Sequence, residues 1–233
     1  MPIKRFIFNE LTSHLAKKEM SLIVGPRQAG KTTLMQHLQN YLQKKGERTV
    51  FLSLDFERDI PHFSTQTAFL SRIKLELGSR KGYVFIDEIQ RKENAGIFLK
   101  GIYDMQTPYK FIISGSGSVE LKEKVHESLT GRKRIFELNT VSLKEFIDFK
   151  TEYKYEDRLS KFFQINKAEG LSLFMEYLNF GGYPRVILED TFEEKPETLK
   201  GRARDIIKGA YKLQDRLLLI IDPEKAVKIT AGA

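Results

Sequence analysis

The sequence predicts an α/β protein in which a parallel β-sheet lies between two layers of helices. Across the first half of the chain, short and almost wholly apolar segments alternate with longer amphipathic ones. Strands without a polar face are typical of parallel sheets that helices cover on both sides. The expected strands span residues 21–24, 50–54, 83–86, 110–114 and 135–138, and the expected helices span residues 32–45, 67–77 and 95–104. Together these segments predict a three-layer domain over residues 1–140.

The pattern changes after this first domain. Residues 142–180 show helical periodicity without obvious strands, and residues 181–184 then interrupt the pattern, because glycine commonly ends a helix. We expect residues 185–233 to be mostly helical again, so that residues 141–233 form a small helical lid and the beginning of a C-terminal domain. The apolar segment 217–221 would need a partner surface, and we therefore expect the natural protein to continue beyond Ala233.

The composition excludes several kinds of site. The chain has no cysteine, which excludes disulfides, thiolate metal sites and cysteine nucleophiles, and its four histidines lie far apart without ligand spacing. No apolar segment approaches the roughly 18–20 residues needed to cross a bilayer, and no apolar segment typical of a signal peptide follows the N-terminus. We therefore expect a cytoplasmic protein without a membrane partner.

A phosphate-binding loop follows the first expected strand. Residues 25–32, Gly-Pro-Arg-Gln-Ala-Gly-Lys-Thr, match the pattern G-x-x-x-x-G-K-[ST] without a mismatch. Glycine permits the positive dihedral angles and the close approach that let successive backbone N–H groups surround a phosphate, and the following helix directs its positive end at the anion. In this pattern Lys31 contacts the β- and γ-phosphates, and Thr32 offers its hydroxyl to Mg²⁺. The predicted ATP-binding residues are Gly25, Pro26, Arg27, Gln28, Ala29, Gly30, Lys31, Thr32 and Thr33.

Two acidic residues follow the third expected strand. Asp87 is expected to hold Mg²⁺ through water together with Thr32, and Glu88 to polarise the attacking water. A solvated strand end would also carry two acids, but their position about 55 residues after the phosphate loop favours the functional interpretation. A glutamate after the aspartate also favours the ATPase branch in which another strand separates this strand from the first one. The predicted strand order is then 5-1-4-3-2.

Two further residues are candidates for the hydrolytic step. Ser114 ends the fourth expected strand, where it or Ser116 could sense the γ-phosphate and orient the water; a serine without such a role would fit equally well. Arg132 follows a glycine and could stabilise the transition state in a neighbouring subunit, as an arginine finger. It could also be a surface arginine, or part of a basic patch with Lys133 and Arg134.

Five short segments, taken in order, resemble one known family. They are Gly-Pro-Arg-Gln-Ala-Gly-Lys-Thr-Thr-Leu, Phe-Ile-Asp-Glu-Ile-Gln, Ile-Ser-Gly-Ser, Leu-Thr-Gly-Arg and Gly-Gly-Tyr-Pro. The chain is similar, over residues 1–190, to the prokaryotic AAA-superfamily P-loop ATPases that carry an uncharacterised C-terminal domain. The resemblance implies an AAA-like core, bound ATP and Mg²⁺, a C-terminal helical and winged-helix-like region, and full-length members that are usually longer. Arg185 stands where the family often has an acid, so we assign it no sensor role.

The leading hypothesis is a Mg²⁺-dependent ATPase that uses hydrolysis for conformational switching. If Arg132 serves a neighbouring site, the protein is a homo-oligomer. The net charge of +8 and the triplet 132–134 favour an alternative, a nucleotide-dependent DNA-binding module. A small-molecule kinase would share the phosphate loop, but Asp87 and Glu88 prepare a water, and we find no Arg-rich lid matched to a phosphate acceptor.

Overall fold

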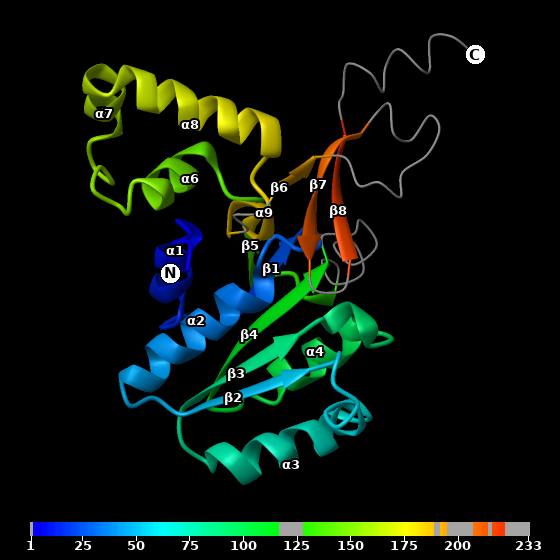
Figure 1. Ribbon diagram of the computed structural model, residues 1–233. Helices are drawn as coiled ribbons and strands as arrows, with labels where there is room; N and C mark the ends of the chain where they lie inside the picture. Colours follow the sequence, from blue (N-terminus) through cyan, green and yellow to red (C-terminus); the bar gives the residue numbers. More distant parts are fainter. Residues whose placement is uncertain (1, 117–127, 189–191, 195–206, 214–215, 222–233) are drawn as a thin grey trace. The chain divides into compact units, whose positions relative to one another are not determined.

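The computed structural model describes residues 2–116, 128–188, 192–194, 207–213 and 216–221 (Figure 1). The chain divides into two compact units, residues 1–141 and residues 142–233. Among the described residues, no helix combines the length and the apolar character that crossing a membrane requires.

The first unit is built on a five-stranded sheet in which every neighbouring pair of strands is parallel. The strands are β1 (Met20–Gly25), β2 (Thr49–Ser53), β3 (Gly82–Asp87), β4 (Tyr109–Ser116) and β5 (Lys133–Glu137). Their spatial order is β2-β3-β4-β1-β5 (Figure 1). Taken from the other edge, this is the predicted order 5-1-4-3-2, which is confirmed.

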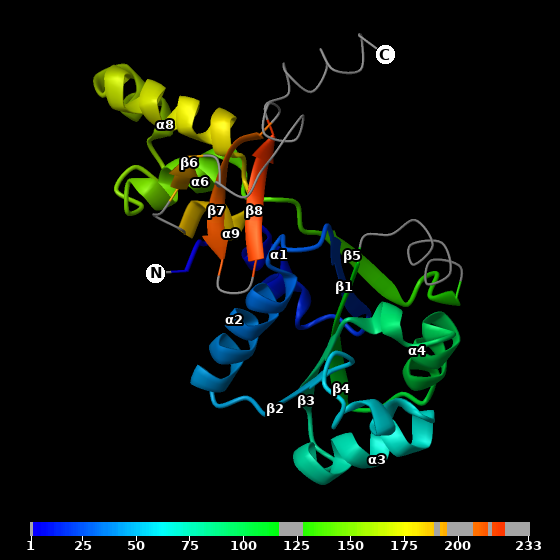
Figure 2. The ribbon, with the colours of Figure 1, turned by 45° about the vertical axis from the view of Figure 1, so that its right-hand side comes forward.

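Helices cover both faces of this sheet (Figure 2). They are α1 (Ile7–His14), α2 (Lys31–Lys44), α3 (Gln66–Leu77) and α4 (Ala95–Asp104), with short 3₁₀ helices η1 (Ile60–Phe63) and η2 (Ile89–Arg91). Alternate residues of each strand belong to opposite hydrophobic clusters: Leu22 packs with residues of α3 and α4, and Ile23 packs with residues of α1 and α2. The three-layer architecture predicted from apolar strands is therefore confirmed.

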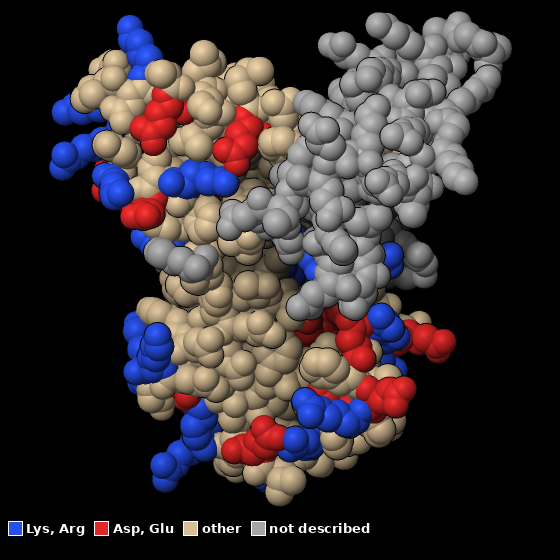
Figure 3. Space-filling view, in the orientation of Figure 1, with Lys and Arg blue, Asp and Glu red and all other residues tan. Residues whose placement is uncertain are grey.

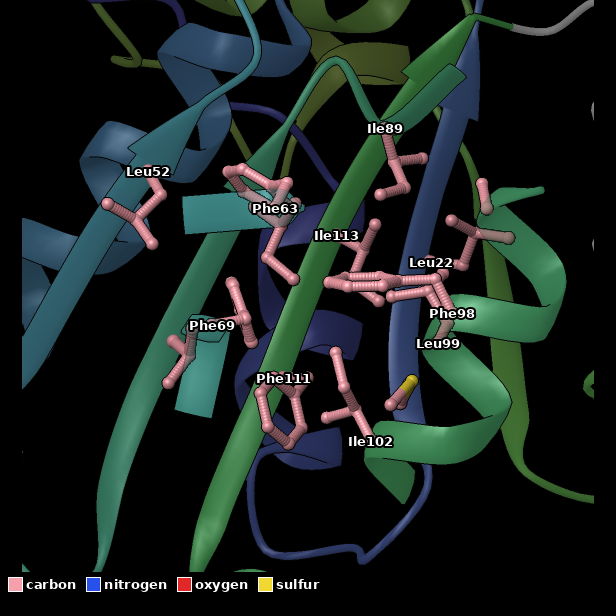
Figure 4. Packing of buried hydrophobic residues seen from close by; sticks show 14 of the residues in the cluster. Leu22, Leu52, Phe63, Phe69, Ile89, Phe98, Leu99, Ile102, Phe111 and Ile113 are labelled. Carbon is pink, nitrogen blue, oxygen red and sulfur yellow. The ribbon is translucent and has the colours of Figure 1, made fainter. Parts of the chain in front are cut away.

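An aromatic group fills the layer between the sheet and helices α3 and α4 (Figure 4). The rings of Phe63, Phe69 and Phe98 lie 5.1–6.0 Å apart between centroids, and Phe69 also contacts Phe111 of β4 at 6.4 Å. All four side chains are buried. Because large aromatic side chains bury much apolar area in fixed geometry, this layer holds the central strands, and hence their carboxyl ends, in place.

The second unit contains α6 (Leu143–Lys150), α7 (Leu159–Ile165), α8 (Lys167–Phe180) and α9 (Pro184–Leu188). Helix α6 begins with a capping box, in which the Ser142 hydroxyl accepts from the Glu145 N–H and the Glu145 carboxylate accepts from the Ser142 N–H. The helices predicted over residues 142–180 are therefore present. Helix α6 packs against α8 through the rings of Phe146 and Tyr177, whose centroids lie 5.5 Å apart.

After α9, the prediction of mostly helical structure is wrong for the segments described. Three antiparallel strands form a second sheet, β6 (Phe192–Glu194), β7 (Ile207–Leu213) and β8 (Arg216–Ile221). The apolar segment 217–221, for which we expected a partner surface, lies in β8. A continuous apolar run of five residues has no period that separates a helix from a buried strand, and isoleucine favours the strand.

Candidate functional site

The predicted phosphate loop connects the end of β1 to the beginning of α2. Gln28 and Gly30 have positive φ angles of 64° and 94°, so the loop turns through the left-handed region twice before the helix begins at Lys31. Gly25 is required for a different reason, because a Cβ atom there would lie 2.0 Å from the carbonyl oxygen of Leu138. The loop thus has the curved backbone, followed by a helix N-terminus, that surrounds phosphate groups in this class of sequence.

Lys31 lies in the first turn of α2, and only 5% of it is exposed. Its Nζ donates to the carbonyl oxygens of Gly25 (3.0 Å) and Pro26 (2.9 Å), both in the loop. Burial lowers the pKa of Lys31, and the carboxylates of Glu88 and Asp87 act in the opposite direction. The ammonium group is therefore held at the loop, where an anion would compensate the cost of burying its charge.

Asp87 connects the loop helix with the ends of two strands. Its Oδ2 accepts from Thr32 Oγ1 at 2.8 Å, and its Oδ1 accepts from the hydroxyl of Ser114 on β4. Ser114 Oγ in turn accepts from the backbone N–H of Glu88 at 3.1 Å. The structure therefore brings together Thr32, Asp87, Glu88 and Ser114, which are far apart in sequence.

Thr32 and Asp87 fit a magnesium site in their chemistry. Mg²⁺ prefers oxygen ligands and binds proteins through one or two side chains, completing its shell with water and substrate phosphates. The described part of the chain contains no group of three or more His, Asp or Glu side chains that could enclose a metal ion by themselves. A magnesium ion at this site would therefore depend on phosphate and water for most of its ligands.

Glu88 follows β3 in a left-handed conformation, with φ 58° and ψ 43°. Its Oε2 accepts from the side-chain Nε2 of Gln90, and Gln90 Oε1 accepts from the backbone N–H of Ser116 at 3.0 Å. Both Glu88 and Gln90 are half-buried. The predicted general base is thus held by a neighbour to which the sequence analysis gave no role.

Arg132 lies at the opposite end of the sheet from the phosphate loop. Its carbonyl accepts from the N–H of Met20, the first residue of β1, at 2.9 Å, whereas the loop follows the last residue of that strand. Its Nε donates to Asp104 Oδ1 at 2.9 Å, and its guanidinium lies 6.0 Å from the ring centroid of Tyr103. Within one subunit, therefore, Arg132 is not brought to the predicted phosphate site.

A family model matches most of the first unit of this chain. The model of the AAA domain family matches residues 17–147, which is more than half of the chain and contains the phosphate loop, Asp87 and Glu88. The chain belongs to the AAA domain family. Its strand order, with β4 between β1 and β3, agrees with the expectation for P-loop ATPases of this kind.

This AAA domain is similar to longer prokaryotic proteins. An uncharacterised protein of Methanocaldococcus jannaschii is 30% identical over 196 residues, covering 84% of this chain and 42% of that protein. An uncharacterised protein of Haemophilus influenzae is 26% identical over 177 residues, covering 73% of this chain and 41% of that protein. The chain therefore spans about two fifths of the length of these two curated relatives.

One solved structure is also similar to this AAA domain. AMPPCP-bound DnaA from Aquifex aeolicus is 18% identical, covering 78% of this chain and 56% of its own, with a TM-score of 0.43.

Arg5 is a further member of the AAA domain's site that no pattern in the sequence marks. Its guanidinium donates to the carbonyl of Ala29 in the phosphate loop at 3.0 Å, and to the carbonyls of Asn139 (2.6 Å) and Thr140 (3.2 Å). An arginine near the N-terminus carries no sequence signal for such contacts. Gln90 did have one, since it belongs to the Phe-Ile-Asp-Glu-Ile-Gln segment that supported the family resemblance.

Proposed function

We propose that this chain binds ATP with Mg²⁺ at residues 25–33 and hydrolyses it. The observation that carries the proposal is the pair of hydrogen bonds on Asp87, one from Thr32 beside the loop and one from Ser114 on the neighbouring strand. In P-loop ATPases, magnesium is held by a hydroxyl in the first helical turn after the loop and by a carboxylate at the end of a neighbouring strand. Membership in the AAA domain family supports the same reaction class.

Each residue has a definite part in this proposal. The loop amides and Lys31 bind the phosphates, and Thr32 and Asp87 would hold a magnesium ion, which would supply positive charge for the phosphate oxygens. Glu88 accepts a proton from a water whose oxygen attacks the γ-phosphorus. The bond from phosphorus to the β–γ bridging oxygen breaks, leaving ADP and inorganic phosphate.

Conformational switching by hydrolysis is part of the proposal. Residues 1–140 would act as the ATPase core, and residues 141–233 as a lid and the beginning of a further domain that responds to the nucleotide. A cytoplasmic location is proposed with it.

Arg132 is proposed to act on a neighbouring subunit. Its position away from its own phosphate loop supports a role in trans, since a residue there can contribute to a phosphate site only across an interface. A turnover rate per subunit that rises with protein concentration and is lost in Arg132→Ala would support this role. A rate independent of concentration and of that substitution would refute it.

Two substitutions test the assignment of the site. Lys31→Ala should abolish ATP binding in calorimetry, because the loop loses its buried positive charge. Glu88→Gln should retain ATP binding and lose turnover, because only the proton acceptor is removed. Lys44→Ala, at the exposed end of the same helix, is the matched control and should behave as the wild type. Wild-type affinity for ATP in Lys31→Ala would exclude this loop as the binding site.

Nucleic-acid binding is the second candidate, favoured by the net charge of +8. Two members of the triplet that motivated it have acidic neighbours: Arg132 pairs with Asp104, and Arg134 lies 3.7 Å from Glu10. On the face of the first unit visible in Figure 3, basic and acidic side chains are interspersed. A shift of labelled DNA that weakens steeply with salt would support this candidate, and no shift at low ionic strength would remove it.

A further inference from the structure

The side chain of Gln90 uses both ends of its amide beside the proposed general base. Its Oε1 accepts from the Ser116 N–H at 3.0 Å, and its Nε2 donates to Glu88 Oε2. These partners determine the orientation of the amide, since a backbone N–H can only donate and an ionised carboxylate can only accept. Reversing the amide would lose both hydrogen bonds at once.

The backbone and the carboxylate of Glu88 are both connected by hydrogen bonds to strand β4. Its backbone N–H donates to Ser114 Oγ at 3.1 Å, and its carboxylate is held through Gln90 to Ser116. Ser114 and Ser116 belong to β4, the strand between β3 and β1. In the parallel register of β4 and β1, Ser116 lies opposite Gly25, the first residue of the phosphate loop. Gln90 therefore ties the carboxylate of Glu88 to the strand position next to that loop.

We propose that Gln90 is a positioning residue for ATP hydrolysis, fixing the carboxylate of Glu88 so that one defined oxygen receives the proton of the attacking water. This inference rests on the proposed function. The amide donates to Oε2 and so directs Oε1, which it does not contact, toward the water, and the left-handed backbone at Glu88 is held from the same strand. Gln90 neither gives nor takes a proton. It limits the directions in which the base can point, which is how positioning contributes to rate.

If Gln90 only positions Glu88, its loss should lower the rate of ATP hydrolysis and leave the affinity for ATP unchanged. Gln90 contacts Glu88 and Ser116 in the hydrogen bonds described here, and neither contact involves the loop residues that bind phosphate. Gln90→Met keeps the length of the side chain and removes both hydrogen bonds. We expect a decrease in kcat of about 10–100-fold, the usual effect of losing a group that orients a functional side chain, with an ATP dissociation constant within about twofold of wild type.

Two further variants make the measurement specific. Gln90→Glu keeps an oxygen acceptor for the Ser116 N–H but loses the donor to Glu88 and adds a like charge beside it, so it should lower kcat at least as far as Gln90→Met. Because Gln90→Glu keeps the hydrogen bond from the Ser116 N–H on β4, it can test the proposal even if Gln90→Met does not fold. Gln43→Met is the matched control, because Gln43 is exposed at the other end of α2 and donates to Thr49 Oγ1 at 3.0 Å.

The experiment is steady-state ATP turnover and calorimetric ATP binding for the wild type and the three variants, with Mg²⁺ and at several protein concentrations. Lower kcat with retained affinity in both Gln90 variants, and wild-type values in Gln43→Met, would support the proposal. Wild-type kcat in a folded Gln90→Met or Gln90→Glu would overturn it and leave the proposed ATPase function standing. A wild type that binds ATP without turning it over at any concentration would overturn both.

Discussion

A buried polar cluster at the amino ends of the strands predicts how stability depends on pH. His14 Nδ1 lies 2.8 Å from Ser21 Oγ and 3.2 Å from Lys110 Nζ, and His14 and Lys110 are each only 5% exposed. Lys110 Nζ also donates to the carbonyls of Lys17 (3.1 Å) and Glu19. Because an ammonium can only donate, Nδ1 of His14 must accept, and the ring is neutral in the folded protein.

Burial, followed by the charge of Lys110, lowers the pKa of His14 from 6.5 to about 4. The unfolded chain therefore binds a proton on His14 at a higher pH than the folded chain does, so stability falls as the pH decreases from about 6.5 to about 4. At about 1.4 kcal/mol per unit of pKa, the full effect is roughly 3 kcal/mol. Between pH 7 and pH 5 linkage gives about 2 kcal/mol, which partial solvent screening reduces to about 1–2 kcal/mol.

Urea unfolding of the wild type and of His14→Gln between pH 7.5 and pH 4.5 measures this contribution. Gln keeps an acceptor for Lys110 but does not titrate, so we expect the wild type to lose about 1–2 kcal/mol more than the variant on going from pH 7 to pH 5. His37→Gln makes the same chemical change on α2, outside the cluster, and is the matched control. Parallel stability profiles for the wild type and His14→Gln would refute the reasoning.

Three further substitutions have defined outcomes. Gly25→Ala should reduce the free energy of unfolding in urea by about 2–4 kcal/mol, because the new methyl group would meet the backbone carbonyl of Leu138, which cannot move aside cheaply. Arg5→Met should weaken ATP binding about 3–10-fold in calorimetry, because it frees the loop from one of its supports. Ser114→Ala should retain ATP binding and lower the turnover rate about 10–100-fold, since it removes the hydroxyl that donates to Asp87 Oδ1 and accepts from the Glu88 N–H.

The sheet of the first unit could be predicted because its determinants are local. Buried parallel strands are short apolar runs, and each of the five predicted runs ends within two residues of the observed strand. The strand order depended on a single residue, Glu88, because a glutamate after the strand-end aspartate distinguishes the branch in which β4 separates β1 from β3. The family match then confirmed the class of fold.

The contacts of the site could not be predicted in the same way. Arg5 reaches Asn139 across 134 residues of sequence and Gln90 reaches Ser116 across 26, and neither distance leaves a pattern in one chain. Strand β8 was missed because a short apolar run has no period of its own. The hydrogen bond of Ser114 with Asp87 gives that serine a local partner, while its contact with a γ-phosphate stays a prediction.

The position of β1 within the sheet also determines when this protein can first hold a nucleotide. Strand β1 pairs with β4 and β5, which follow it by more than 80 residues, and with neither β2 nor β3. Closing such long loops costs entropy before any contact compensates for it. A nascent chain whose residues 25–32 have left the ribosome, but whose strands β4 and β5 have not, would therefore be unable to retain ATP. We expect the ability to bind nucleotide to arise only once Leu138 has left the ribosome and can pack against Gly25.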